Sequence, residues 1–236
     1  MDLGLTGRVA VVTAASKGLG RASAQALAAE GARIVLNARN ADTLEELAAT
    51  MPDAIVVAGD ITDPDMPAQL VDAAVARWGR IDIVVANAGG PPTGRALDVD
   101  DDQILAAVNA NMLASIRLAR AAVPYMRSQH WGRVCLIASA SVRQPIPDLT
   151  LSNIARTGLW AWAKTAAQDL AGEGITVNLA APGLHATDRL VERGVSGRTG
   201  DPADFGKVIA FMCSEAASFI NGIALGVDGG SVAGLL

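Results

Sequence analysis

Short runs of Val, Ile, Ala and Leu alternate along the chain with stretches whose apolar residues recur at helical spacing. A short apolar run bounded by turn residues is typical of a strand that is buried on both faces of a parallel sheet. Strands that alternate with helices predict an α/β fold in which helices cover both faces of the sheet. The predicted strands are Val9–Val12, Arg33–Asn37, Ile55–Ala58, Ile81–Ala86, Arg133–Ile137, Ile175–Leu179 and Ile223–Val227.

Helical patterns fill the intervals between these strands. The first predicted helix begins near Gly20 and ends near Gly31, and the others span about 43–50, 65–78, 100–126, 151–171 and 202–213. We expect Asp42 or Thr43 to cap the second helix. No linker, repeat or low-complexity tract interrupts the alternation, and 236 residues suit one domain. We therefore predict a single doubly wound, Rossmann-type domain over 1–236, with a mostly parallel sheet of seven strands.

Composition narrows the range of partners. The net charge of −5, the absence of a basic run and the presence of only three Phe and one Tyr argue against a nucleic-acid surface. No apolar stretch reaches the ~18 residues of a membrane-spanning helix, and the N-terminus lacks the pattern of a signal peptide. The two cysteines, Cys135 and Cys213, lie in apolar surroundings, where they are expected to act as small core residues. We predict a cytoplasmic protein that acts on a small molecule.

The turn between the first strand and the first helix predicts an anion site. Free backbone N–H groups and the positive end of the helix dipole meet there, and glycines let a pyrophosphate approach the backbone. The segment from Thr13 to Gly20 resembles the cofactor loop T-G-x-x-x-G-x-G of the classical short-chain dehydrogenases/reductases. Ala14 stands where that motif has its first glycine, so a positive φ at this position would produce strain.

This resemblance extends to almost the whole chain, from Gly7 to Gly230, and implies the cofactor-binding residues. In dinucleotide folds, an acid after the second strand binds the ribose 2′-OH of NAD, whereas an Arg accommodates the 2′-phosphate of NADP. Here Ala38 occupies the acidic position and is followed by Arg39, while Lys17 offers a second cation, so the prediction is NADP(H). Solvated surface is the alternative for either charge. The implied cofactor residues are Thr13, Ala15, Ser16, Lys17, Gly18, Leu19, Arg39, Asp60, Ile61, Asn87, Ala88, Gly89, Arg156, Pro182, Gly183 and Thr187.

The catalytic pattern of the resembled family is Asn, Ser, Tyr and Lys, and this chain keeps only half of it. Asn111 matches the Asn, with Asn109 as the nearby competitor, and Ser139 matches the Ser, with Ser141 as a possible second hydroxyl. The Y-x-x-x-K motif is expected at 152–156, where the chain has Ser152 and Arg156. Helical spacing places this pair on one face of a helix, so a hydroxyl still lies beside a cation while the acidic phenol is lost.

Three functions remain compatible with this replacement. The first is an NADP(H)-dependent oxidoreductase, similar to 3-oxoacyl-carrier-protein reductases, in which a water, Ser152 or another side chain supplies the proton. His185 is a candidate donor because it follows Pro182-Gly183, although an exposed loop histidine is the alternative. The second is a cofactor-binding sensor or silent subunit with little turnover. The third is a different reaction on the same scaffold.

The substrate side of the predicted cleft is short. The loop 184–200 carries Arg189, Arg193 and Arg198, which could attract an acidic substrate or simply form a solvated surface. We expect 145–147 to line the opposite wall. The resemblance implies a homotetramer or homodimer that pairs through the helices around 100–126 and 152–172. Trp160 and Trp162 lie on different sides of their helix, so one of them is a candidate interface anchor.

Overall fold

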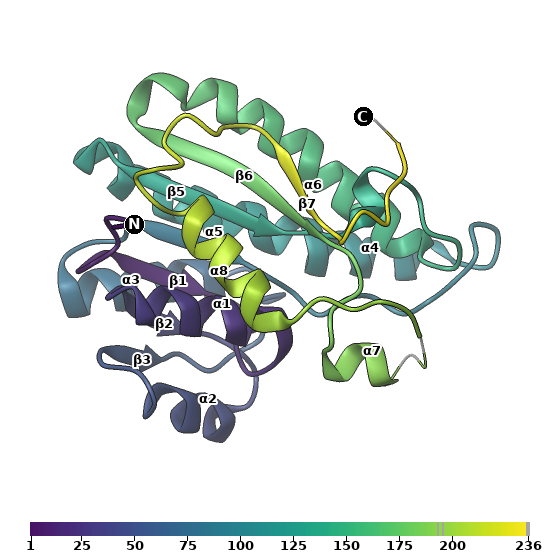
Figure 1. The fold of residues 1–236 in the computed structure, drawn as a ribbon, viewed down its shortest axis with the longest axis horizontal. Coiled ribbons are helices and arrows are strands. Elements are labelled where there is room, and N and C mark those ends of the chain that lie inside the picture. The colour runs from purple at the N-terminus through teal and green to yellow at the C-terminus, as the bar shows by residue number, and fades with distance from the viewer. Residues whose placement is uncertain (193, 195, 235–236) are drawn as a thin grey trace.

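A sheet of seven parallel strands forms the centre of the computed structural model, which describes residues 1–192, 194 and 196–234. The strand order is β3-β2-β1-β4-β5-β6-β7 (Figure 1). The strands are β1 (Val9–Val12), β2 (Arg33–Leu36), β3 (Ala54–Val56), β4 (Ile83–Ala86), β5 (Gly132–Ile137), β6 (Ile175–Pro182) and β7 (Ala224–Val227). Every predicted strand is present, within a few residues of its expected bounds, and the predicted doubly wound α/β fold is confirmed.

Helices cover both faces of the sheet (Figure 1). One face carries α1 (Gly18–Ala29), α2 (Ala41–Ala48) and α8 (Pro202–Met212). The other carries α3 (Met66–Trp78), α5 (Ala114–Gln129) and α6 (Thr150–Asp169). Two further helices, α4 (Asp101–Val108) and α7 (Asp188–Glu192), lie at the carboxyl ends of the strands. No helix among the described residues is long and apolar enough to cross a membrane.

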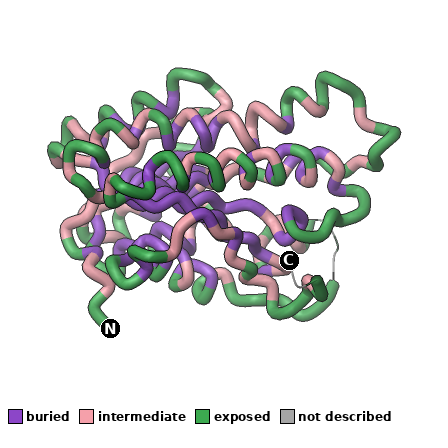
Figure 2. Tube along the Cα trace, turned by 90° about the horizontal axis from the view of Figure 1, so that it is seen from above, coloured by how far each residue is buried: buried purple, intermediate pink, exposed green. Residues whose placement is uncertain are grey.

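Alternation along the strands divides the apolar core into two layers. In β1, Val9 and Val11 pack into the layer under α3, α5 and α6, whereas Ala10 and Val12 pack under α1, α2 and α8. Figure 2 shows the buried strands running through the middle of the molecule between exposed helical surfaces. Helices α1 and α8 pack closely, because a Cβ on Gly206 would lie 2.3 Å from the Ala22 carbonyl oxygen. Gly206 therefore allows the close approach of these two helices.

Two helical predictions need correction. The cap of α2 is Asn40, whose side chain accepts a hydrogen bond from the Thr43 N–H, so the helix begins earlier than Asp42 or Thr43 implied. The helix predicted over 100–126 is α4, a π-helical segment (Asn109–Leu113) and α5 in succession. Hydrophobic periodicity could not reveal the π turn, because the flanking helices each keep a regular apolar face.

The sheet has a topological switch point between β1 and β4. From β1 the chain builds outward to β2 and β3, then returns to β4 and builds in the opposite direction. Ligands of open α/β sheets bind in the crevice outside the carboxyl ends of such strands. The two ends are tied together by Thr13, whose hydroxyl donates to the Asn87 carbonyl (2.6 Å) and accepts from the Asn87 N–H (2.8 Å).

Candidate active site

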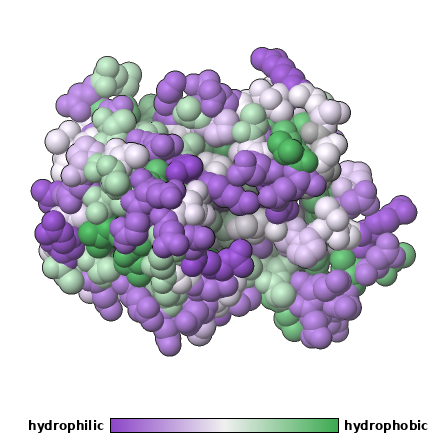
Figure 3. Space-filling view, turned by 90° about the horizontal axis from the view of Figure 1, so that it is seen from below, coloured by the Kyte–Doolittle hydropathy of each residue, from purple (hydrophilic) through white to green (hydrophobic). Residues whose placement is uncertain are grey.

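A cavity of about 620 Å³ opens at this edge of the sheet. Its walls come from the loops after β1, β2, β3, β4, β5 and β6, together with α6 and α7. On the face seen in Figure 3, hydrophilic residues surround a hollow in the surface. Most predicted site residues line the cavity: Ser16, Lys17, Gly18, Leu19, Arg39, Asp60, Ile61, Asn87, Ala88, Gly89, Ser139, Ser152, Arg156, Pro182, Gly183, His185 and Thr187.

Three predicted site residues are not among the lining residues. Thr13 is buried between β1 and β4, where its hydroxyl holds the two strand ends together. Ala15 is buried and donates its backbone N–H to the Asn37 carbonyl (2.9 Å). Asn111 lies behind the wall and reaches the cavity through Arg156. These three residues fix the shape of the site.

The loop after β1 leaves the first turn of α1 open to the cavity. Lys17 is the N-cap residue in an extended conformation, and its side chain makes no capping hydrogen bond. The first N–H groups of a helix lack intrahelical acceptors and carry the positive end of the helix dipole, so they suit a phosphate. Gly18 has φ +58° and faces Thr187 across the cavity, where an added Cβ would lie 3.5 Å from the Thr187 methyl carbon.

Ala14 has the left-handed backbone conformation that the sequence analysis identified as the unfavourable case, with φ +49°. A non-glycine residue in this region costs roughly 1–2 kcal/mol. The Ala14 carbonyl packs closely against Gly20, where an added Cβ would lie only 2.3 Å from its oxygen. The loop therefore keeps its shape at the expense of strain at one residue.

The cavity end at β2 and β3 carries the charge pattern expected for a phosphorylated ribose. Ala38 is buried at the position where an acid would stand, and Arg39 beside it is exposed. The Asp60 carboxylate accepts from the Thr62 N–H (2.9 Å) and hydroxyl (2.8 Å), and these bonds together with the charge of Arg39 lower the pKa of Asp60. Asn37, which the sequence analysis overlooked, donates to the Val57 and Gly59 carbonyls and positions this loop.

At the opposite end, α6 presents Ser152 and Arg156 one turn apart. Arg156 is buried, and its guanidinium donates to the Ile137 carbonyl (2.7 Å) and the Asn111 side-chain oxygen (3.0 Å). Burial, and then the nearby charge of Arg189, lower the pKa of Arg156 to about 10. The guanidinium is therefore still protonated at neutral pH.

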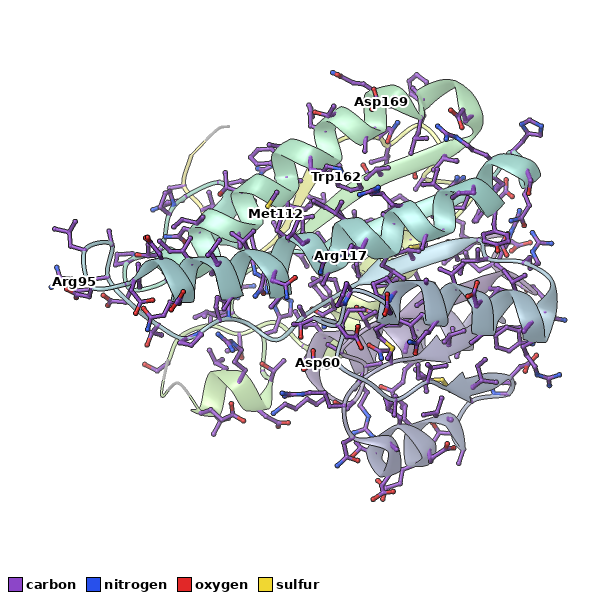
Figure 4. All side chains as sticks on the ribbon, turned by 180° about the vertical axis from the view of Figure 1, so that it is seen from behind. Asp60, Arg95, Met112, Arg117, Trp162 and Asp169 are labelled. Carbon is purple, nitrogen blue, oxygen red and sulfur yellow. The ribbon has the colours of Figure 1, made fainter. Side chains whose placement is uncertain are left out.

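The structure distinguishes the two candidate asparagines. Asn111 lies in the π-helical segment and contacts Arg156 directly. Asn109 instead donates to the Thr62 carbonyl and accepts from Arg117. The π turn thus lets one asparagine face the site while its neighbour anchors the helix to the loop after β3. Figure 4 shows Asp60, from that loop, and Arg117 on this side of the molecule.

The two serines at the cavity differ in their bonding. The Ser139 hydroxyl accepts a hydrogen bond from the Ser141 N–H (3.1 Å). Ser152 makes no side-chain hydrogen bond to any described residue, although it is 6% exposed. Ser141, considered as a second hydroxyl, is buried and is not among the residues that line the cavity. Tyr125, the only tyrosine of the chain, is on α5 and packs against the core, so this chain brings no phenol to the cavity.

His185 is not the exposed loop residue that was the alternative. It is 7% exposed, and its ring packs edge-on against Phe205 with 5.2 Å between the ring centroids. Its Nδ1 lies 3.3 Å from the Gly183 carbonyl oxygen. A Cβ on Gly200 would lie 3.0 Å from the ring edge that carries Nε2. Its role as a proton donor stays a prediction.

Arg189 on α7 is not plain solvated surface. It is half-buried, lines the cavity, and donates to the carbonyls of Gly90 (2.9 Å) and Pro91 (3.1 Å). A Cβ on Gly90 would lie 2.3 Å from the guanidinium, so this glycine makes room for it.

The other predicted residues on the substrate side are not among the described residues that line the cavity. Arg198 is exposed, and Arg193 lies outside the described residues. The expected wall at 145–147 is replaced by Leu149.

Comparisons with known proteins agree with this geometry. A sequence model of the family described as Enoyl-(Acyl carrier protein) reductase matches residues 13–232. The 3-oxoacyl-[acyl-carrier-protein] reductase FabG of Thermotoga maritima is 31% identical over 97% of this chain and 99% of its own. Human dehydrogenase/reductase SDR family member 4 is 32% identical over 96% of this chain and 88% of its own. L-sorbose reductase from Gluconobacter frateurii, solved with NADPH and L-sorbose, superposes with a TM-score of 0.94 at 30% identity, and all of both chains is covered.

Proposed function

Because the chain belongs to the short-chain dehydrogenase/reductase family, we propose that it is an NADP(H)-dependent oxidoreductase with a non-standard proton donor. The proposed reaction transfers a hydride between the nicotinamide and a carbonyl or alcohol substrate. The observation that supports it most directly is the cluster of Asn111, Ser139, Ser152 and Arg156 at one end of the cavity. Burying polar groups is costly unless they are hydrogen-bonded, and a few convergent polar groups in a cavity are typical of a ligand site.

The residues at the other end of the cavity fit a phosphorylated dinucleotide. The uncapped first turn of α1 offers N–H groups to a pyrophosphate, and Gly18 keeps the space in front of Thr187 free of a side chain. Lys17 and Arg39 provide cations for a 2′-phosphate, and Ala38 places no carboxylate against it. The relative that was solved with NADPH supports the same choice of cofactor.

Bound NADPH would supply the hydride, and the residues of this chain would manage the charge on the oxygen. Ser139 and Ser152 are the hydroxyls that can orient a carbonyl oxygen at the cavity wall. Arg156 stabilises negative charge on that oxygen but remains protonated at neutral pH. An aliphatic hydroxyl is a far weaker acid than a phenol, so a water at Ser152 is the proposed proton source. Ser152 itself and His185 are the alternatives.

A turnover assay tests this function. NADPH is added with a panel of ketones, 3-oxoacyl thioesters and quinones, and the absorbance of the reduced nicotinamide is followed. Oxidation by any of them supports the proposal, and Ser152→Ala, Arg156→Ala and His185→Ala then separate the proton sources. Loss of activity only in His185→Ala would identify the imidazole, whereas full activity in that variant removes it from the mechanism.

A second function follows from the absence of a phenol at the cavity. The chain would then be an NADP(H)-binding sensor or silent subunit, and tight NADPH binding without oxidation of any compound would favour it.

For either function we expect a cytoplasmic homotetramer or homodimer. Trp160 and Trp162 are half-buried and pack against the core, and Figure 4 shows Trp162 and Met112 on the side formed by α5 and α6. This is the surface proposed for pairing.

A further inference from the structure

The Arg156 guanidinium is a buried cation without a counter-ion among the described residues. It bonds to two neutral oxygens, the Ile137 carbonyl and the Asn111 amide, and no carboxylate of the described chain lies within ion-pair distance. A guanidinium has five N–H donors, so up to three of them have no acceptor from those residues. A buried charge without a partner is costly, and a bound anion would remove that cost.

A second arginine adds positive charge to the same end of the cavity. Arg189 lies close enough to Arg156 to lower its pKa, and its bonds to Gly90 and Pro91 fix its position on the cavity wall. The carboxylates among the lining residues are Asp60, which is beside Arg39 at the other end, and the exposed Asp188. This end of the cavity is therefore suited to an anion.

The position of the charge relative to the hydroxyls indicates the kind of anion. Ser152 is one helical turn from Arg156. One small molecule can therefore place an oxygen at the Ser152 hydroxyl and a neighbouring negatively charged group at the guanidinium. A guanidinium matches a carboxylate through two parallel hydrogen bonds. We propose that the substrate is a 2-oxo carboxylate or its 2-hydroxy counterpart, with the carboxylate bound by Arg156 and attracted by Arg189.

This inference rests on the proposed oxidoreductase function, and its reaction balances without a further reagent. The hydride from NADPH forms a C–H bond at C2 of the 2-oxo acid, and the C=O π pair moves to oxygen, which takes a proton from water. The products are the 2-hydroxy acid, NADP⁺ and a hydroxide ion, which the solvent buffer neutralises. Arg156 can also donate to a ribose hydroxyl of the cofactor, but a neutral hydroxyl does not neutralise its charge.

A comparison of two ligands on the unmodified protein tests the charge alone. Pyruvate and methyl pyruvate share the reacting ketone, and only pyruvate is an anion. We expect kcat/KM for pyruvate, or for a 2-oxo acid with a longer side chain, to exceed that of its methyl ester by about tenfold or more. Equal values, or a preference for the ester, would overturn the proposal.

A binding experiment separates this proposal from the function on which it rests. Titration of the NADPH complex with oxamate, an unreactive analogue of pyruvate, is expected to show binding that weakens about tenfold or more in Arg156→Gln. Arg189→Gln, on a half-buried surface helix, is expected to weaken it several-fold and guards against misfolding of the first variant. Lys207→Gln is the matched control, because Lys207 is exposed, pairs with Asp204 and does not line the cavity.

The outcomes of the two experiments are distinguishable. If oxamate binding depends on Arg156 but none of the tested substrates causes oxidation of NADPH, the anion site stands and the oxidoreductase function is rejected. Oxidation of NADPH by neutral ketones together with absent oxamate binding, or with equal binding in all variants, would leave the oxidoreductase intact and reject the anion site.

Discussion

Both ends of the cavity are formed at the carboxyl edge of the sheet, but their positively charged side chains differ in exposure. At the β1–β3 end, both Lys17 and Arg39 are exposed to solvent, and Lys17 also forms an exposed ion pair with Glu192 (3.3 Å). At the α6 end, Arg156 is buried against neutral oxygens, and burial lowers its pKa to about 10. The first end can therefore bind a ligand loosely and reversibly, whereas the second is organised around an anion that the chain itself does not supply.

The comparison also shows which end departs from the family. The dinucleotide end keeps its expected residue types, with one alanine in place of a glycine. At the α6 end, the resemblance places Ser152 and Arg156 where the family has a phenol and an ammonium, and we propose that this end departs from the family there. Five experiments would break or sharpen this contrast, and they follow from the largest expected effect to the smallest.

The largest effect is expected from Gly20→Ala at the dinucleotide end. The new Cβ would lie 2.3 Å from the Ala14 carbonyl oxygen and 2.9 Å from the Asn87 amide nitrogen, so the loop must shift. Overpacking of this kind costs roughly 1–3 kcal/mol in free energy of unfolding, and NADPH affinity should fall by more than about 100-fold. Chemical denaturation and NADPH fluorescence titration measure the two effects. Unchanged affinity would mean that this loop does not bind the cofactor.

Restoring the family's pair at the catalytic end should change its chemistry. In Ser152→Tyr/Arg156→Lys a phenol regains a neighbouring ammonium, and we expect turnover of neutral ketones to rise by roughly 100-fold, since general acid catalysis contributes 10²–10⁴-fold. Ser152→Phe/Arg156→Lys is the matched control, because it adds the same ring without the hydroxyl. Equal turnover in the two double variants would show that the proton comes from elsewhere.

Arg39→Asp should shift the cofactor preference from NADPH toward NADH. A carboxylate at this position repels a 2′-phosphate and accepts from a 2′-hydroxyl, so the affinity for NADPH over NADH should fall by roughly 10- to 100-fold, the equivalent of a charged hydrogen bond. Arg33→Asp is the control for cofactor preference, because Arg33 begins β2, the strand that precedes Arg39, and lies away from the cavity, where it pairs with Asp53. A ratio that does not move would mean that Arg39 does not contact the cofactor.

Titration of Arg156 should limit anion binding at high pH. Because the pKa of Arg156 in the protein is about 10, the guanidinium is charged up to roughly pH 9, and the affinity for oxamate should not change with pH over that range. Above the pKa the affinity should fall by about tenfold per pH unit, because one proton is then taken up on binding. Calorimetric titration between pH 7 and pH 11, as rough limits, measures this slope. The same decline in Arg156→Gln would assign it to another group.

The smallest effect is expected from Ala14→Gly. Removing the methyl group relieves a left-handed conformation, φ +49°, and should stabilise the protein by about 1 kcal/mol, reduced by the greater flexibility of glycine in the unfolded chain. NADPH affinity should rise no more than a few-fold. Thermal unfolding against Ala15→Gly, at a buried alanine without positive φ, provides the control. A destabilised Ala14→Gly would contradict the assignment of strain.

Much of the fold could be predicted from the sequence, because the strands of a parallel sheet are buried on both faces and therefore appear as continuous apolar runs. The loop motifs after those runs also located most of the cavity wall. The residue type of His185 does not reveal its burial, because its environment depends on Phe205 and Gly200, which the fold brings against the ring. For Arg189 the sequence left an anion-attracting role and a solvated surface both open, because its acceptors are the carbonyls of Gly90 and Pro91, about 100 positions away. Backbone angles such as the φ of Ala14 have no signal in residue type.

The π-helical segment at 109–113 has a consequence for how rigidly the catalytic end is held. A π turn departs from the hydrogen-bond pattern of the α-helices around it and is frequently found at functional sites. Asn111 lies in this turn and accepts a hydrogen bond from Arg156, so the position of the guanidinium depends on the geometry of the turn. A shift confined to this one turn would therefore move the charge in the cavity while both flanking helices stay folded.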